Sequence, residues 1–185
     1  MVKKILVILL VVFLSGCSGI DKKNLTSQQY TYQAYYTAIK ENNKYVAGSE
    51  YFDVSAEMSE LPDGKYLYYV FIDNPRVAMF NIKAMVMENS YTMNENDSVL
   101  LPTVGIFDDS IVNMVPYQVN TELGFQKGIV LSGEATSDNI VLDLIVTWDN
   151  NDKSKSFREF YQIELNMSGY DFVENVSQDT KNVGA

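Results

Sequence analysis

The chain contains few side chains that could do covalent or acid–base chemistry. Its 185 residues include one cysteine and no histidine, against 24 aspartates and glutamates. The lack of histidine excludes Ser-His triads and nearly all zinc or copper sites. The single thiol, Cys17, has no second cysteine with which to form an intramolecular disulfide. The residues around Cys17 therefore decide what chemistry the thiol undergoes.

Cys17 follows a stretch with the three parts of a secretory signal. Two lysines precede an unbroken apolar run at residues 5–14, and two small residues follow it. The run is too short for a stable membrane span, which needs roughly 20 apolar residues. The motif Leu14-Ser15-Gly16-Cys17 resembles the lipobox of bacterial lipoproteins. That resemblance implies cleavage before Cys17 and attachment of a diacylglycerol to its sulfur. The alternative is an uncleaved anchor with an incidental cysteine.

This interpretation predicts a chain held on the extracytoplasmic face of a cell membrane. Residues 1–16 form the signal peptide, 17–26 the lipidated cysteine and tether, 27–165 the folded domain and 166–185 a polar tail. Removal of residues 1–16 takes away two lysines, so the net charge falls from −10 to −12. Such acidity argues against a nucleic-acid partner and against adhesion of the domain to anionic lipid. The membrane contact is expected through the diacylglycerol on Cys17.

The domain is expected to begin with one helix, about residues 27–42, capped by Thr26 or Ser27. Tyr32, Tyr35, Tyr36 and Ile39 have the i, i+3, i+4, i+7 spacing of one helical face. Four tyrosines in seven residues could form a ligand stack. Packing of the helix on a sheet is the favoured interpretation.

From residue 51 onward the hydrophobic period is two, which is typical of strands. Residues 65–72 are apolar on both faces, which predicts a central strand covered twice, with the helix as the second cover. In residues 77–88, strict alternation would put Phe80, Ile82 and Ala84 on one face and Met79 and Met85 on the other. Further strands are expected at 51–58, 100–107, 111–115, 124–134, 139–148 and 156–165. Inward residues of the 139–148 strand include Trp148, whereas Asp143 and Thr147 face outward. The fold class is therefore mostly β, an immunoglobulin-like β-sandwich with one N-terminal helix; a lipocalin-like barrel is the alternative.

Three segments resemble uncharacterised lipoproteins of Gram-positive bacteria. They are Tyr69-Val-Phe-Ile-Asp-Asn-Pro75, Thr103-Val-Gly-Ile-Phe-Asp108, and Trp148 together with Arg158-Glu-Phe160. The resemblance extends over most of residues 30–165. It implies an envelope location and brings neither an activity nor catalytic residues.

Two kinds of acidic site remain open. Paired carboxylates could hydrolyse a glycan if two acids stood about 5–10 Å apart in a cleft. The candidates lie in predicted turns or on solvent faces: Asp53, Glu57, Asp73, Asp108 and Asp149. The loops at 94–97 and 149–152 offer oxygens for calcium but lack the EF-hand spacing, and turn formation explains them better. We therefore assign no catalytic residue, no metal ligand and no cofactor.

Three functions follow, in descending order of support. The first is a non-catalytic binding module for an envelope protein or a cell-wall polymer, acting through loops at one end of the sandwich. The second is a lipocalin-like carrier of a small ligand. Its cavity would be lined by aromatic residues and methionines: Tyr66, Tyr68, Phe80, Met85 and Met87. The third is a carboxylate-based hydrolase of wall glycans.

Overall fold

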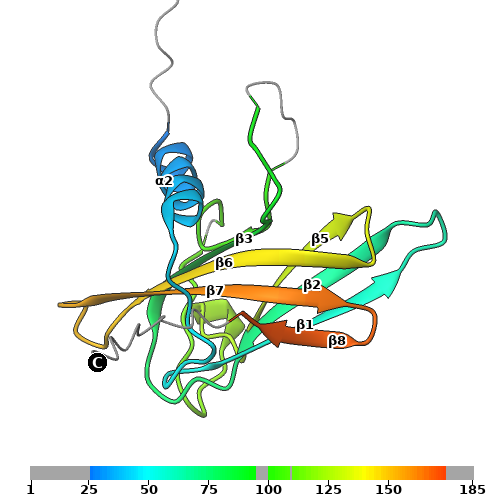
Figure 1. The fold of residues 1–185 in the computed structure, drawn as a ribbon. Helices are drawn as coiled ribbons and strands as arrows, with labels where there is room; N and C mark the ends of the chain where they lie inside the picture. The colour runs from blue at the N-terminus through cyan, green and yellow to red at the C-terminus, as the bar shows by residue number, and fades with distance from the viewer. Residues whose placement is uncertain (1–25, 95–99, 109, 174–185) are drawn as a thin grey trace, which may run out of the picture.

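The computed structural model describes residues 26–94, 100–108 and 110–173, and Figure 1 shows their arrangement. The signal, the Leu14-Ser15-Gly16-Cys17 motif and the tether up to residue 25 lie outside these ranges, as do residues 174–185. The elements, in chain order, are the helix α2 (Ser27–Glu41), β1 (Asp53–Glu60), β2 (Tyr66–Asp73), β3 (Phe80–Glu88), β4 (Thr103–Val104), the 3₁₀ helix η2 (Thr121–Leu123), β5 (Ile129–Ala135), β6 (Asn139–Asp149), β7 (Ser156–Asn166) and β8 (Gly169–Phe172).

The strands form two antiparallel sheets that face each other. One has the order β1-β2-β5 and the other the order β4-β3-β6-β7-β8. Side chains from the two inner faces make up the main core, with Trp148 and Tyr161 among the largest that are fully buried. This arrangement confirms a mostly β, sandwich-like fold with one helix. Because the described strands divide into two sheets, the barrel alternative is not supported.

Period-two alternation predicts the buried face correctly in the regular strands. In β6, the residues expected to face inward all belong to the core between the sheets, from Ile140 to Trp148. The same is true of Val54 and Ala56 in β1. A strand with one face against a core keeps its register, because a shift by one residue would expose every apolar side chain.

The strand β3 departs from strict alternation at a bulge. Its pairing with β6 is interrupted between Phe80 and Lys83, and Asn81 has a φ of +51°. The extra residue changes which side chains face the core. Met79 and Ile82 therefore both lie between the sheets, although they were expected on opposite faces. The side-chain Oδ1 of buried Asn113 accepts a hydrogen bond from the backbone N–H of Asn81 (3.0 Å), which holds the bulge in place.

The helix α2 is predicted correctly in its bounds but not in what it covers. Thr26 caps it with a reciprocal bond to Gln29, which is a capping box. Its buried face packs on the outer face of the five-stranded sheet, against Met85, Met87 and Ile145. The expected cover of β2 is therefore wrong, although β2 is the central strand of its own sheet. The outer face of β2 is instead half-buried, with Tyr69 and Phe71 stacked at 6.1 Å between ring centroids.

The tyrosines of α2 serve to join the helix to the sheet and to the segments on either side of residues 95–99. The Tyr32 hydroxyl accepts a hydrogen bond from the backbone N–H of Leu101 (3.0 Å), and the Tyr36 hydroxyl accepts one from Met93 (3.0 Å). The Tyr35 hydroxyl bonds to Thr147 of β6. Packing, rather than a ligand stack, accounts for this tyrosine face.

The Tyr32→Phe substitution tests this role. Removing the hydroxyl leaves the buried N–H of Leu101 without that acceptor, which costs about 1–3 kcal/mol of unfolding free energy. Urea unfolding of the two proteins measures the difference. Tyr30→Phe is the matched control, because Tyr30 is exposed and its substitution is expected to change the free energy by less than about 0.5 kcal/mol. Equal effects at the two positions would contradict the assignment.

Two further expectations are corrected. Of residues 100–107 and 111–115 only Thr103–Val104 forms a strand, while Asn113, Met114 and Val115 make isolated bridges. Residues 166–185 were expected to be an irregular tail, but Gly169–Phe172 forms β8 at the edge of the larger sheet. The turn before β8 is stabilised by a bond from the Ser168 N–H to the Asn166 side chain (2.7 Å), and Phe172 packs against the core.

Candidate binding loop and its cleft

The segment 111–127, which we call the Tyr117 loop, projects from the domain on the side opposite the start of α2. In Figure 1 it includes the yellow-green loop at the bottom, whereas α2 begins at the top. Backbone bonds tie it together: Asn113 N–H to Gly124 O and Gln126 N–H to Asn113 O, both 2.8 Å. Asn120 caps the short helix η2, and Gly124 ends it with a φ of +77°. Hydrogen bonds within the loop therefore stabilise its conformation.

The tip of this loop is a tight turn over Val115, Pro116, Tyr117 and Gln118. The Gln118 N–H donates to the Val115 carbonyl at 3.0 Å, which closes a four-residue turn. Proline at the second position and a positive φ at the third, here +63° for Tyr117, are the signature of a type II turn. Glycine or asparagine is the usual residue at the third position, because other side chains are strained there. Tyr117 is held in that conformation and is fully exposed.

The Tyr117 loop also carries other exposed apolar side chains. Tyr117, Leu123 (68% exposed) and Val119 (61%) are the three most exposed large apolar residues in the described ranges, and Ile111 is 58% exposed. Large apolar side chains usually scatter singly over a protein surface. Their concentration on one loop is typical of an interaction site.

A cleft of about 680 Å³ lies beside the tip of the loop, between it and the end of the smaller sheet. Its walls include Tyr117, Val119 and Lys127 on one side and Asp53 and Arg76 on the other. The cleft is therefore lined by apolar side chains of the loop tip and by charged side chains.

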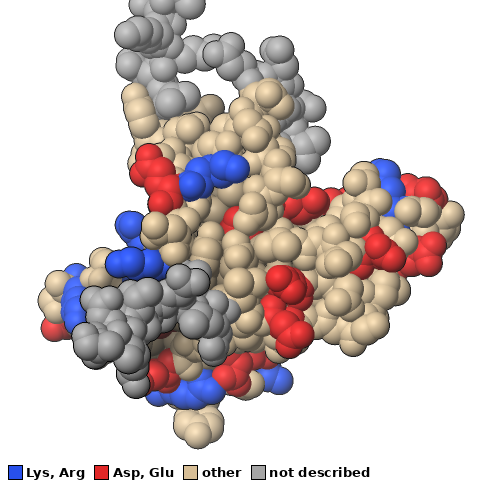
Figure 2. Space-filling view, in the orientation of Figure 1, with Lys and Arg blue, Asp and Glu red and all other residues tan. Residues whose placement is uncertain are grey.

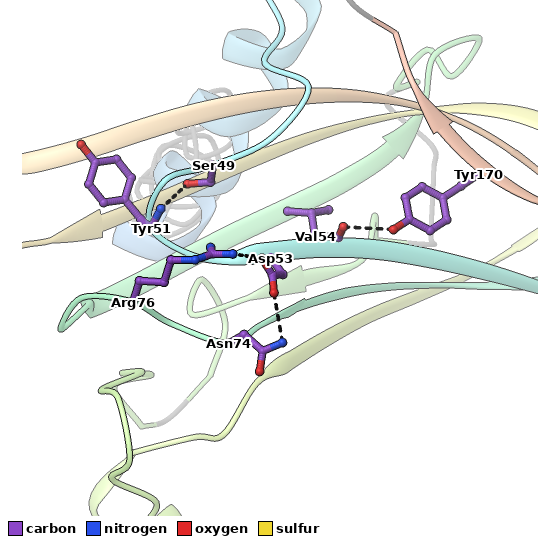
Figure 3. A network of polar contacts seen from close by, with 7 residues as sticks. All are labelled: Ser49, Tyr51, Asp53, Val54, Asn74, Arg76 and Tyr170. Atoms are coloured by element: carbon purple, nitrogen blue, oxygen red, sulfur yellow. Dashed lines mark hydrogen bonds and ion pairs between the residues drawn. The ribbon is translucent and has the colours of Figure 1, made fainter.

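Asp53 is the centre of the polar side of the cleft (Figure 3). Its carboxylate accepts bonds from the Arg76 guanidinium and from the Asn74 side-chain amide, the latter at 3.1 Å. These bonds, above all the one from Arg76, hold the pKa of Asp53 below its ordinary value. The Arg76 backbone N–H donates to the Tyr51 carbonyl at 2.7 Å, which fixes the turn. Asp53 is therefore an ionised acceptor that orients Arg76.

Of the five acids considered for hydrolysis, only Asp53 and Asp73 are neighbours. Asp53 and Asp73 are cross-strand partners, so their Cβ atoms lie about 5 Å apart. The carboxylate of Asp108 accepts a bond from the Gly105 N–H, and Glu57 is exposed on β1. Asp149 accepts bonds from Ser156 and Asn81 on the other sheet. The pKa of Asp53 is lowered by its bonds from Arg76 and Asn74, which suits an ionised carboxylate, whereas a hydrolase also needs a second acid whose pKa is raised.

The loops considered for calcium are explained by turn formation as far as they are described. Asp152 accepts two bonds from Ser154, and Asn150 accepts one from the Lys155 N–H. In the described ranges no three acidic side chains come together as a metal site would require. Of the loop at 94–97, residues 95–97 lie outside the description.

The residues expected to line a carrier cavity do not share one space. Tyr68 lies in the core between the sheets, whereas Met85 and Met87 face α2 on the other side of the larger sheet. Phe80 is only half-buried and meets Phe125 edge-on at 6.4 Å between ring centroids. Tyr66 is half-buried at the rim of the core. These five side chains therefore fill separate parts of the structure.

One acidic side chain that the sequence pattern places on a solvent face is buried in the structure. Asp143, expected to face solvent, is 4% exposed on the helix-covered face of β6. It accepts a bond from the Gln162 side-chain amide at 2.9 Å, with Tyr45 and Lys40 also near it. Burial raises the pKa of this carboxyl above its ordinary value. The burial of Asp143 could be recognised only after α2 had been placed over this face of the sheet.

The raised pKa of Asp143 predicts a pH dependence of stability. The folded protein holds this proton more tightly than the unfolded chain, so the contribution of Asp143 to stability falls as the pH rises from about 4 through the folded pKa. Asp143→Asn removes this dependence. Urea unfolding between pH 4 and pH 7 should show the variant gaining stability relative to the wild type as the pH increases.

Glu164→Gln, an exposed change on the neighbouring strand β7, is the control for that titration. It is expected to follow the wild-type pH profile. A difference between Asp143→Asn and wild type that stays constant over the whole range would contradict the prediction.

In the part of the chain that the structure describes, no helix is long and apolar enough to cross a membrane. Comparison with protein-family models, with curated proteins and with solved structures found no match for this chain.

Proposed function

We propose that this chain is a non-catalytic binding module, anchored by lipid at Cys17 on the extracytoplasmic face of a cell membrane, whose Tyr117 loop binds a protein of the envelope. The anchor is supported by the Leu14-Ser15-Gly16-Cys17 motif. The binding role is supported chiefly by one observation: Tyr117 is fully exposed in a strained backbone conformation. Strain that no packing explains is a reason to look for a function.

A protein partner suits the composition of this surface. Interface cores are enriched in aromatic residues and arginine, and tyrosine and arginine dominate binding energies where they are anchored. Tyr117, Leu123 and Val119 supply the apolar centre, while Arg76, held by Asp53, supplies a charged group whose orientation is already fixed. Pre-organised groups lose less entropy on binding.

The position of the loop also favours a partner away from the bilayer. The helix α2 begins at one end of the domain, and the Tyr117 loop lies at the other (Figure 1). A chain tethered through residues before Ser27 would present this loop outward. The anchor and the recognition surface would then not compete for space.

We further propose that the sandwich is immunoglobulin-like. In that fold, strands A, B and E share one sheet and C, F and G the other, and an additional C′ strand joins the second sheet in variable-type domains. The sheets β1-β2-β5 and β4-β3-β6-β7 correspond to A-B-E and C′-C-F-G in both chain order and neighbours. The Tyr117 loop then belongs to the connection before strand E.

The Tyr117→Gly substitution separates binding from stability. Glycine suits the positive φ at the third turn position, so the variant is expected to gain about 0.5–1 kcal/mol, or roughly 2 °C in melting temperature. Removing a central tyrosine from an interface costs about 2 kcal/mol or more, which weakens binding at least about thirtyfold. The measurements are a thermal melt and quantitative co-purification of proteins from detergent-solubilised native membranes by the tagged full-length chain.

Tyr30→Ala serves as the matched control, because it removes an exposed tyrosine from α2 instead. It should retain every protein that the wild type co-purifies. The proposal is wrong if Tyr117→Gly retains the same proteins as the wild type.

A further inference from the structure

The outer face of the five-stranded sheet carries a cationic row next to α2. Lys83 of β3, Thr147 of β6 and Arg158 of β7 are cross-strand partners in sequence along this row. Neighbouring strands lie about 4.8 Å apart, so the backbones bearing the two cations are separated by about 10 Å, with Thr147 between them. A groove of about 480 Å³ lies over the row, and Tyr35 of α2 forms part of its wall.

Neither cation of this groove forms an ion pair within the described part of the chain, although Lys83 acts electrostatically on Asp149. Neither Lys83 nor Arg158 has a carboxylate oxygen within the 4.0 Å that defines an ion pair, whereas Lys65 and Arg76 do form such pairs. Lys155 lies nearby, with its Nζ 4.7 Å from the ring centre of Phe157. Figure 2 shows blue side chains on the left of the molecule, towards the β6–β7 hairpin. The lining of the groove holds two cations and one carboxylate, in a chain whose net charge is −10.

The polar groups of the groove are held in place by one another. The hydroxyls of Tyr35 and Thr147 bond to each other. The Asp149 carboxylate, at the end of the groove, accepts bonds from Ser156 (2.6 Å) and from the side-chain amide of Asn81 (2.7 Å). Those bonds hold the pKa of Asp149 below its ordinary value, and Lys83 and Lys153 lower it further. The groove thus has a cationic middle and an ionised acceptor at one end.

We propose that this groove binds a phosphate group between Lys83 and Arg158, on a ligand whose hydroxyl groups donate to Asp149. Arginine presents a planar set of donors that matches phosphate oxygens, and lysine adds a compact charge. The hydroxyls of Thr147 and Tyr35 lie between them as further polar groups. A carboxylate at one end would repel a bare polyanion but would accept bonds from a polyol. The ligand class is therefore a phosphorylated polyol.

Two sources share this chemistry: a soluble polyol phosphate and the glycerol phosphate headgroup of an anionic lipid. The groove lies on the α2-bearing face of the larger sheet and shares no lining residue with the cleft beside Tyr117. It is thus a second site, and its occupancy does not depend on the protein partner proposed above. The strongly negative net charge opposes general adhesion to anionic surfaces, so binding is expected to need this local group of cations.

The test uses the full-length protein in neutral detergent micelles and calorimetric titration with glycerol 3-phosphate, with glycerol as the uncharged comparison. The wild type should bind the phosphate and not glycerol. Lys83→Gln and Arg158→Gln should each weaken binding about tenfold or more, because each removes a charged hydrogen-bond donor. Lys44→Gln makes the same charge change at an exposed position outside the groove and should leave the affinity unchanged.

A second arm replaces the micelles by phosphatidylcholine bicelles with or without phosphatidylglycerol. Binding that depends on phosphatidylglycerol and is lost in Arg158→Gln identifies a lipid headgroup as the source, and binding to glycerol 3-phosphate alone identifies a soluble ligand. The proposal is overturned if the wild type binds neither probe, or if the groove variants and Lys44→Gln behave alike. Arg158 is exposed, so a circular dichroism melt matching the wild type is expected to show that the variant folds.

Discussion

Trp148→Ala should lower the free energy of unfolding by about 3–5 kcal/mol. Trp148 lies on the inner face of β6 and is 2% exposed. Its ring stacks on Phe157 at 5.3 Å and 7° and meets Phe52 edge-on at 5.3 Å. These contacts join the two sheets, since β1 begins next to Phe52 and β6 and β7 belong to the larger sheet. Removing the ring leaves a cavity that neighbours on two separate sheets cannot easily fill.

The loss is large against the total stability of a domain of this size, about 5–15 kcal/mol. Urea unfolding monitored by far-ultraviolet circular dichroism measures it, since the variant has no tryptophan left for fluorescence. Trp148→Phe should cost less because it keeps an aromatic ring in the same place. Tyr30→Ala, an exposed change, should cost less than about 0.5 kcal/mol. A loss below about 1 kcal/mol for Trp148→Ala would contradict a core between the two sheets.

Cys17→Ala should abolish lipid attachment completely. In the proposed anchor the sulfur of Cys17 is the atom that carries the diacylglycerol, and no other cysteine is present to replace it. Two or more acyl chains give stable anchoring, at about 0.8 kcal/mol for each buried methylene. The measurement is incorporation of labelled palmitate in growing cells, read on the immunoprecipitated protein.

Ser18→Ala provides the control for that labelling experiment, because it leaves the Leu14-Ser15-Gly16-Cys17 motif intact and should incorporate label normally. Continued labelling of Cys17→Ala would mean that the cysteine is incidental and that residues 5–14 act only as a hydrophobic segment.

The regular strands were predictable because one face of each lies against a core. In β6, alternation over Ile140 to Trp148 is unbroken, and the structure buries those residues. In β3 the same rule fails at Asn81, because the bulge depends on a tertiary hydrogen bond from the Asn81 N–H to the side chain of Asn113, 32 residues further along the chain. The strand β8 has only four residues, so its period of two has too few members to be recognised.

The position of α2 could not be predicted for a different reason. Both β2 and β3 carry apolar side chains on two faces, so each was a possible partner for the tyrosine face of the helix. The choice depends on relative burial. The helix α2 covers Met85 and Met87 of β3 completely, whereas on β2 the rings of Tyr69 and Phe71 partly cover each other without the helix. Pairwise preferences of this kind are not local in sequence.

The candidate sites were only partly visible before the structure. Binding through loops at one end of the sandwich was expected, and the Pro116-Tyr117 pair could have marked a type II turn with an unusual third residue. The structure adds that Tyr117 is fully exposed, which makes the Pro116-Tyr117 turn a candidate binding site. The row of Lys83, Thr147 and Arg158 could not be predicted from the sequence. Lys83 lies 64 positions before Thr147, and Arg158 lies 11 positions after it, so their neighbourhood depends on the pairing registers of three strands.

The most direct test of the central claim is site-specific photo-crosslinking in cells that make the anchored, full-length protein. A benzophenone amino acid replaces Tyr117 in one protein and Tyr30 in another; both are exposed aromatic positions, the first on the Tyr117 loop and the second on α2. We expect a discrete protein adduct from position 117 that is absent from position 30. No protein adduct at position 117, or the same adducts at both positions, would contradict this claim.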